Sequence, residues 1–337
     1  MNPPAANAAD PFGEFGSSQR AIELDLLGTR FEFRSDSAEL LDLVDQAYAD
    51  LPAQRLGATP APLRVDLALI DDISLADQAE PPLPRMHGGA GLFGAVIDGA
   101  NFAFAAPAAR GACVSISRGL LAAHRYHARY ELLEFAVFTL ASRAQNLAPL
   151  HAGCVGWQGR GVLLIGDSGA GKTTLTLQAL LEGMEFLTED ASFVDPASLK
   201  VTGVANFLHP RFDALRFVKA EARRVQMQAA PVIRRRSGVE KFEVDLRGSG
   251  AVLAATPLAL QAIVFLSPEV SDGQPLLRPL DLATATVRLR ATQPYAAQLD
   301  NWPAFERSIA KLRCFELRRG AHPREGVAAL GELLGRH

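Results

Sequence analysis

The stretch VLLIGDSGAGKTTL, residues 162–175, decides the fold of this 337-residue chain. Four apolar residues at 162–165 are typical of a buried strand, and an amphipathic helical run begins at 172. Between them, GDSGAGKT at 166–173 fits the phosphate-binding pattern G-x-x-x-x-G-K-[ST] at every position. The sequence therefore predicts an α/β fold in which a strand, a glycine-rich loop and a helix follow one another.

The chemistry of such a loop requires these residue types. Glycines permit the positive φ angles with which backbone N–H groups turn toward phosphate oxygens, and the helix points its positive N-terminus at them. Lys172 would supply a cation to the β- and γ-phosphates, and the Thr173 hydroxyl a hard oxygen ligand for Mg²⁺. ATP and Mg²⁺ are the expected cofactors. The predicted nucleotide-binding residues are Gly166, Asp167, Ser168, Gly169, Ala170, Gly171, Lys172, Thr173 and Thr174.

An acidic pair, Glu189-Asp190, follows the strand-like run MEFLT. Asp190 lies 17 residues after Thr173. One helix and one returning strand fit in that length, which would bring the pair back beside the glycine-rich loop. One carboxylate could hold Mg²⁺ and the other could accept a proton from an attacking hydroxyl. The alternative is a pair of solvated turn residues, and acidic pairs of that kind are common at strand ends.

His151 begins the strand that precedes the loop, 21 residues before Lys172. A histidine at a strand end more often packs or forms a hydrogen bond than takes part in catalysis. Together with Cys154 it makes an HxxC spacing, but no second ligand pair is near, so a zinc site is not favoured.

The run from His151 through GRGVLLIGDSGAGKTTLTLQALLEGMEFLTED resembles the catalytic domain of HPr kinase/phosphorylase, and most of all its relatives with a different N-terminal region. The family pattern is a His, a G-x-G-V turn, G-[DE]-S-G-x-G-K-S, a helix, a glycine and a closing Asp-Asp. The resemblance is close over residues 150–195, looser over 196–266 and absent from the first 148.

The resemblance implies a serine kinase for a protein or peptide, with the compact P-loop fold shared with phosphoenolpyruvate carboxykinase. By that likeness Asp190 is the base that deprotonates the acceptor hydroxyl, and the acid in the reverse phosphorolysis. His151 would lie near that carboxylate, and Lys172 completes the catalytic set. Thr173 and Glu189 are the residues expected to face the metal.

The chain departs from the family pattern at several positions. Thr173 stands where the family usually has Ser, Thr174 where Glu is frequent, and Glu189 in place of the first Asp. The family's further magnesium-binding Glu before an Arg-Gly loop has no clean counterpart, since Asp245 in DLRG and the ALR at 214–216 compete for it. The sugar-transport phosphocarrier is therefore not assumed as the substrate.

We expect three parts: a flexible tail over 1–20, a smaller α+β N-terminal domain over 21–148, and the P-loop kinase domain over 149–337. The N-terminal part holds alternating strands, a helix after Ser37, a hairpin with its turn at Asp98-Gly99, and a long helix from about 117 to 146. It shows no phosphate-binding or acid–base pattern, so substrate recognition or assembly is its expected role.

The later part is expected to hold a long apolar strand at 257–266 and helices near 281–290, 303–312 and 324–334. The segment 203–250 is loop-rich, and eight basic residues lie between Arg211 and Arg236. Most of these are expected to be solvated, and Lys241 and Arg247 are the better candidates for a phosphate contact.

Composition excludes several other classes. With 34 Lys and Arg against 37 Asp and Glu the net charge is −3, and aromatics do not alternate with the basic residues, so nucleic acid is not an expected partner. The three cysteines are too few for a disulfide framework, and no export signal or membrane span is apparent. A cytoplasmic protein that binds a nucleotide and a protein or peptide acceptor is the expectation, and a homo-oligomer is compatible with it.

Two alternatives remain open at this stage. One is a small-molecule kinase, and the other is a nucleotide-binding switch or assembly factor with little turnover. A GTPase is disfavoured because the N-K-x-D base-recognition motif is absent.

Overall fold

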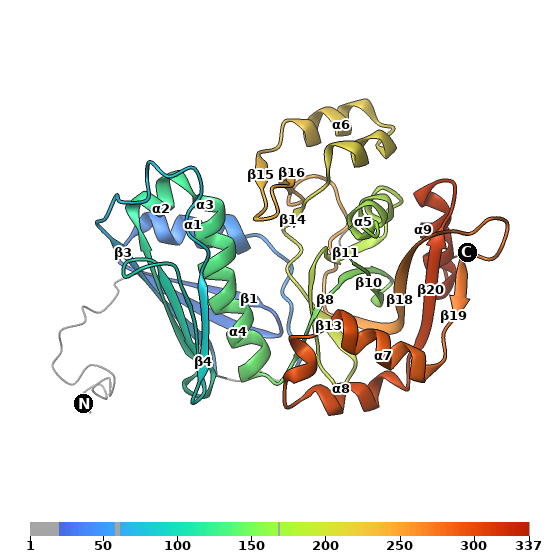
Figure 1. Cartoon of the computed structure of the whole chain (residues 1–337), viewed down its shortest axis with the longest axis horizontal. Helices are drawn as coiled ribbons and strands as arrows, with labels where there is room; N and C mark the ends of the chain where they lie inside the picture. Colours follow the sequence, from blue (N-terminus) through green and yellow to red (C-terminus); the bar gives the residue numbers. More distant parts are fainter. Residues whose placement is uncertain (1–19, 58–60, 168, 337) are drawn as a thin grey trace.

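The structure, a computed structural model, describes residues 20–57, 61–167 and 169–336. It is a mixed α/β structure with two large sheets, which confirms the class expected from the sequence (Figure 1). We call residues 20–147 the N-terminal region and 148–336 the C-terminal region. The tail expected over 1–20 lies outside the described residues, except for Arg20, which begins the first strand.

The N-terminal region is built on a seven-stranded sheet of order β1-β2-β3-β7-β6-β5-β4. Strands β2, β3 and β7 are parallel and the other pairs antiparallel. The predicted strands and the hairpin are confirmed. Their bounds are β1 Arg20–Leu26, β2 Thr29–Ser35, β3 Leu63–Ile70, β4 Arg85–Gly89, β5 Leu92–Val96, β6 Phe102–Ala106 and β7 Gly111–Ser117, with a 3₁₀ turn η1 at Pro107–Ala109.

Helices pack on this sheet around a single apolar core. Helix α1 (Ala38–Tyr48) begins at its predicted cap, where the Leu40 N–H donates to the Ser37 hydroxyl. The prediction of a single helix from about 117 to 146 is wrong. His124 has φ −134° and ψ 42°, outside the helical region, and breaks it. The pieces are α2 (Arg118–Ala123), α3 (Arg125–His127), a π-helical segment η2 (Ala128–Leu133) and α4 (Glu134–Ala144).

The C-terminal region contains a nine-stranded sheet whose centre is three parallel strands, β10, β18 and β20. The long apolar strand predicted near 257–266 is β18. The bounds are β8 Ala148–His151, β9 Gly153–Trp157, β10 Arg160–Ile165, β11 Glu185–Thr188, β12 Ala191–Val194, β13 Lys200–Thr202, β18 Leu258–Val270, β19 Leu277–Pro279 and β20 Arg313–Arg319.

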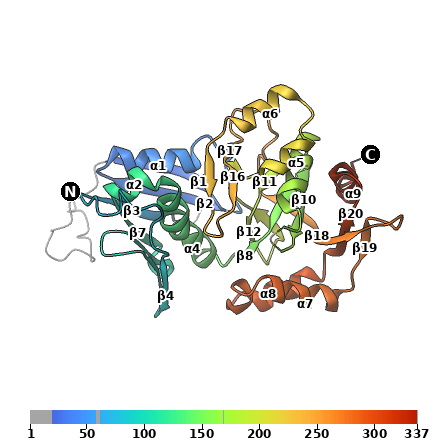
Figure 2. The same ribbon diagram turned by 45° about the horizontal axis from the view of Figure 1, so that its top comes forward.

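Helices cover both faces of this sheet, because successive side chains of β10 point to opposite sides. Val162 and Leu164 enter the core beneath α5 (Lys172–Leu181) and α9 (Pro323–Leu334). Leu163 and Ile165 enter the core formed with α7 (Leu282–Thr292) and α8 (Trp302–Ile309), which a 3₁₀ turn η4 (Ala296–Gln298) connects. Figures 1 and 2 show the helix pairs on opposite sides. No helix within these described ranges is long and apolar enough to cross a bilayer.

The segment expected to be loop-rich contains short elements that cover α5 from above in Figure 1. They are β14 Phe207–Leu208, η3 Phe212–Phe217, α6 Glu221–Gln228, β15 Val232–Arg234, β16 Glu240–Phe242 and β17 Val244–Asp245. Their apolar side chains share a small core with Leu177 and Leu180 of α5 and with Phe186 of β11. The β15–β16 hairpin lies between the N-terminal region and α5 (Figure 1).

Candidate functional site

The glycine-rich loop connects β10 to α5, as the sequence predicts. Gly169 and Gly171 have φ of +84° and +100°, which L-residues with side chains rarely adopt. The Lys172 ammonium donates a hydrogen bond back to the Gly166 carbonyl, and the Arg319 guanidinium of β20 donates to the Gly169 carbonyl at 3.1 Å. The loop thus closes over its own lysine. Ser168 lies outside the described residues.

The acidic pair occupies the two positions between β11 and β12. Glu189 is 6% exposed, and its Oε1 accepts a hydrogen bond from the Thr173 hydroxyl at 2.5 Å. Its Oε2 accepts from the backbone N–H of His209 at 2.6 Å and lies 3.1 Å from that residue's Nδ1. Burial alone would raise the pKa of Glu189, but His209, Lys241 and Thr173 together lower it to about 2. A charged carboxylate is thereby fixed under the first turn of α5.

Asp190, the second member of the pair, points to the surface instead. Its Oδ1 lies 3.2 Å from the Nδ1 of His151 at the end of β8, and both side chains are about half exposed. The His151 backbone is held by Gln293, whose side chain accepts from the His151 N–H at 2.7 Å and donates to its carbonyl at 3.2 Å. Gln293 follows α7 and is 4% exposed, so it fixes the end of β8 from below.

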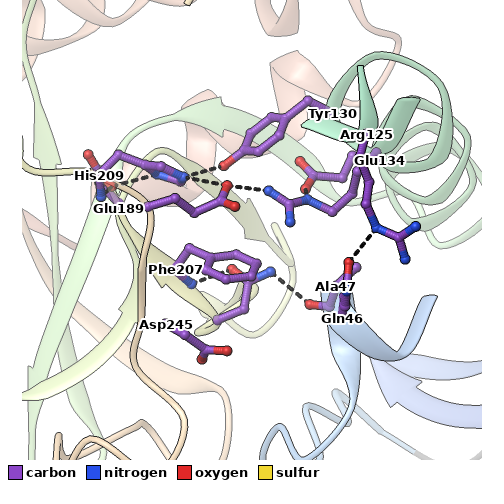
Figure 3. Close-up of polar contacts among 12 residues, drawn as sticks. Gln46, Ala47, Arg125, Tyr130, Glu134, Glu189, Phe207, His209 and Asp245 are labelled. Atoms are coloured by element: carbon purple, nitrogen blue, oxygen red, sulfur yellow. Dashed lines mark hydrogen bonds and ion pairs between the residues drawn. The ribbon is translucent and has the colours of Figure 1, made fainter. Parts of the chain in front are cut away.

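A buried polar network continues from Glu189 into the N-terminal region (Figure 3). The Nε2 of His209 lies 2.8 Å from the Tyr130 hydroxyl and 3.4 Å from Oε1 of Glu243. Glu243 in turn accepts a hydrogen bond from Arg129, a residue of the π-helical segment η2. Burial would lower the pKa of His209, but its bonds to Glu189 and Glu243 raise it. A continuous chain of charged groups therefore connects η2 with the start of α5.

A second cluster of contacts fastens the C-terminal region to the end of α1. The Arg247 guanidinium donates to the carbonyls of Asp45, Gln46 and Ala49 at 3.2, 2.7 and 3.0 Å. The Asn206 amide donates to the Ala47 carbonyl at 2.8 Å (Figure 3). The last carbonyls of a helix have no partner within the helix, and a cation there also meets the negative end of its dipole. The expectation of a phosphate contact for Arg247 is therefore wrong.

One cavity of about 810 Å³ lies above the loop. Every predicted site residue that the structure describes, apart from Gly166 at the base of the loop, contributes to its lining. Lys241 also lines it, with its Nζ 4.0 Å from Oε1 of Glu189, and its contact with phosphate stays a prediction. At one end the wall includes Tyr126, Tyr130 and Glu131 from the N-terminal region; at the other it includes residues of β20 and the start of α9.

Within the described ranges, no group of three or more His, Cys, Asp or Glu side chains is arranged to hold a metal ion. The oxygens that face each other are those of Thr173 and Glu189. Both are hard ligands, and Mg²⁺ usually takes only one or two protein ligands while water and phosphate oxygens supply the rest. The pair therefore fits a magnesium ion bound together with a nucleotide.

Among the residues of the site that were not identified from the sequence are His209, Tyr130, Arg129 and Gln293. A signal existed for Arg129, because Arg129 and Glu134 lie five residues apart in a helical run whose later part is mainly apolar, and charges in a buried face need partners. The other three are single polar residues in unremarkable surroundings, and only the tertiary fold brings them to the cavity.

Comparison with known proteins identifies no relative by sequence: no protein-family model and no curated protein matches the chain. Among solved structures, the chain is similar to "Structure of the Hpr(Ser) kinase/phosphatase from Coxiella burnetii", with 14% identity over 56% of this chain and 99% of that one. The TM-score is 0.29.

Proposed function

We propose that this chain is an ATP- and Mg²⁺-dependent kinase that transfers the γ-phosphate to a serine hydroxyl of a protein or peptide. The observation that carries the proposal is the meeting of two kinds of group in one cavity. Lys172 and Thr173 begin α5 under a glycine-rich loop, while the accessible carboxylate of Asp190 lies beside them. The first group suits a polyphosphate, and the second suits a hydroxyl that must lose its proton.

The phosphates are held, in this proposal, by the loop N–H groups, by Lys172 and by Lys241. Burial lowers the pKa of Lys172, and the carboxylates of Asp190 and Asp167 partly oppose that effect. Thr173 and Glu189 would hold Mg²⁺, which would draw negative charge from the β- and γ-phosphates. The hydrogen bonds from His209 hold Glu189 in the orientation that presents Oε1 to Thr173.

Asp190 acts as the base. As the acceptor oxygen bonds to the γ-phosphorus and the bond to the bridging oxygen breaks, the hydroxyl proton passes to the Asp190 carboxylate. His151, 3.2 Å away and anchored by Gln293, orients that carboxylate. The serine acceptor comes from the resemblance of residues 150–195 to the HPr kinase/phosphorylase catalytic domain; the geometry itself requires only a hydroxyl.

The test is a matched pair of variants assayed for label transfer from γ-labelled ATP to candidate acceptors, the protein itself included. Asp190→Asn should keep Mg·ATP affinity by calorimetry and lose transfer roughly 10²–10⁴-fold, the range for a positioned acid–base group. Glu189→Gln should raise the Mg²⁺ concentration needed for nucleotide binding, and excess metal should restore part of the rate.

The opposite pattern, with Glu189→Gln inactive at saturating metal and Asp190→Asn active, would reverse the two roles. If both variants keep full activity, the phosphotransfer mechanism is wrong. If the wild-type protein binds Mg·ATP and transfers phosphate only to a small hydroxyl compound, it is a small-molecule kinase. Tight binding without any transfer would indicate a nucleotide-dependent switch.

A further inference from the structure

The end of the cavity nearest the N-terminal region is formed by residues from both halves of the chain. Tyr126 and Tyr130 come from α3 and η2, and Arg235 directly follows β15 on the hairpin between the two regions (Figures 1 and 2). The centre of the Arg235 guanidinium lies 5.9 Å from the Tyr126 ring centroid and 5.0 Å from that of Tyr130. Two aromatic rings therefore fix the position of this cation.

Arg235 differs from its neighbour Arg236 in its polar contacts. Arg236 donates two hydrogen bonds to the Glu131 carboxylate, both at 2.6 Å, and a third to the Pro81 carbonyl at 2.5 Å. Among the described residues, the Arg235 guanidinium makes no hydrogen bond or ion pair, although it lines the cavity. Its five N–H donors are thus free to receive a ligand in the fork geometry that suits a carboxylate.

Arg235 lines the same cavity as Asp190, the carboxylate proposed as base. Burial would lower the pKa of Arg235, but Tyr126, Tyr130, Asp190 and Glu189 together raise it, so the guanidinium stays charged although it is partly buried. A ligand group held by Arg235 would therefore occupy the cavity in which the hydroxyl reacts.

We propose that Arg235, set against Tyr126 and Tyr130, binds a carboxylate of the acceptor beside the serine that is phosphorylated. The acceptor is then an acidic segment, in which Asp or Glu neighbours the reacting serine. This inference rests on the proposed kinase function and gives it a substrate class. The N-terminal region accordingly supplies part of the acceptor site through its two tyrosines.

The test uses the full chain and two pools of short serine peptides that are identical except that Asp flanks the serine in one and Asn in the other. Label transfer from γ-labelled ATP is measured for the wild type and for Arg235→Gln, Arg235→Lys and Arg234→Gln. Arg234 is the matched control, because it lies on the same hairpin, is exposed and does not line the cavity. Mg·ATP affinity is measured for each protein by calorimetry.

The wild type should favour the Asp pool by roughly tenfold to hundredfold in kcat/KM, as for a hydrogen-bonded charge pair. Arg235→Gln should lose that preference with Mg·ATP affinity unchanged, Arg235→Lys should recover part of it, and Arg234→Gln should keep it. Equal transfer to both pools by the wild type would leave the kinase proposal standing and overturn this inference. Weaker Mg·ATP binding in Arg235→Gln would overturn it too, because Arg235 would then serve the nucleotide phosphates.

A second measurement does not depend on transfer. Phenylglyoxal labelling of Arg235, read by mass spectrometry with Mg·ADP present, should be suppressed by the Asp pool and not by the Asn pool. If the Asp pool alone protects Arg235 from labelling but no phosphate is transferred, the carboxylate site stands and the proposed kinase function is refuted. Absence of both protection and transfer would refute the two proposals together.

Discussion

Replacing Glu134 by Gln should stabilise the protein at alkaline pH and leave it unchanged in acid. Glu134 begins α4 and is 8% exposed, and its nearest cation, Nε of Arg129, lies 3.9 Å away. Burial raises the pKa of Glu134 to about 7, and the charges of Arg129 and His209 only partly oppose it. Arg129 helps little because its close contact is with Glu243.

The magnitude follows from linkage between protonation and folding. The pKa of Glu134 is about 7 in the folded protein against an ordinary value of 4.5. Because the folded value is the higher one, the stabilising effect of the protonated group is complete below pH 4.5 and is lost as the pH rises through 7. At about 1.4 kcal/mol per pH unit, ionisation costs about 3 kcal/mol above pH 8. Gln cannot ionise and avoids this cost.

Urea denaturation of both proteins at several pH values between 4.5 and 8.5 measures the difference. The two should have equal free energies of unfolding at the acid end and diverge in favour of Glu134→Gln at the alkaline end. Glu131→Gln is the control with the opposite sign, since it removes the partner of Arg236 and should lower stability at neutral pH. A Glu134→Gln variant that is less stable than the wild type at pH 8 would show that Glu134 is a favourable ion-pair partner, and would refute the reasoning.

Three further outcomes are expected. Lys172→Ala should abolish phosphoryl transfer and weaken ATP binding, because it removes the cation beneath the loop; unchanged affinity and turnover would exclude this loop as the nucleotide site. Gln293→Leu should release the end of β8 and lower turnover more than Mg·ATP affinity, and crystallography should find His151 displaced from Asp190. Arg247→Met should destabilise the fold by roughly 2–4 kcal/mol, because charge-assisted bonds to three carbonyls at the end of α1 are lost. Mg·ATP affinity should not change, because Arg247 makes no contact with the phosphates. A loss of nucleotide affinity as large as the loss of stability would return Arg247 to the site.

The order of elements and the place of the acidic pair could be predicted because both depend on short-range patterns. The apolar run at 162–165, the glycines after it and the spacing to Asp190 leave little choice of local structure, and the structure has β10, α5 and β11 there. The break at His124 could not be predicted in the same way, because no Gly or Pro marks it and helical propensity favours continuity.

The contacts between the two regions were beyond reach for a different reason. His209 and Tyr130 are 79 residues apart and touch only in the tertiary fold. The sequence favoured Arg247 over Arg235 for a contact in the site, yet Arg235 lines the cavity and Arg247 binds the end of α1. The two arginines differ in the direction in which their side chains point, and the pattern of charges in a sequence does not reveal that direction.

The π-helical segment η2 gives the chain one place in this helical run where its length can change. A π turn holds one residue more than an α turn, and here it spans Ala128–Leu133. Deleting one residue there would let the segment close as an ordinary α-helix, and the part before it would keep nearly the same rotation relative to α4. A deletion within α4 would instead rotate the two parts of the helix by about 100° relative to each other. Single-residue deletions within 128–133 should therefore disturb folding less than deletions within α4, and a deletion scan across both segments would show this difference.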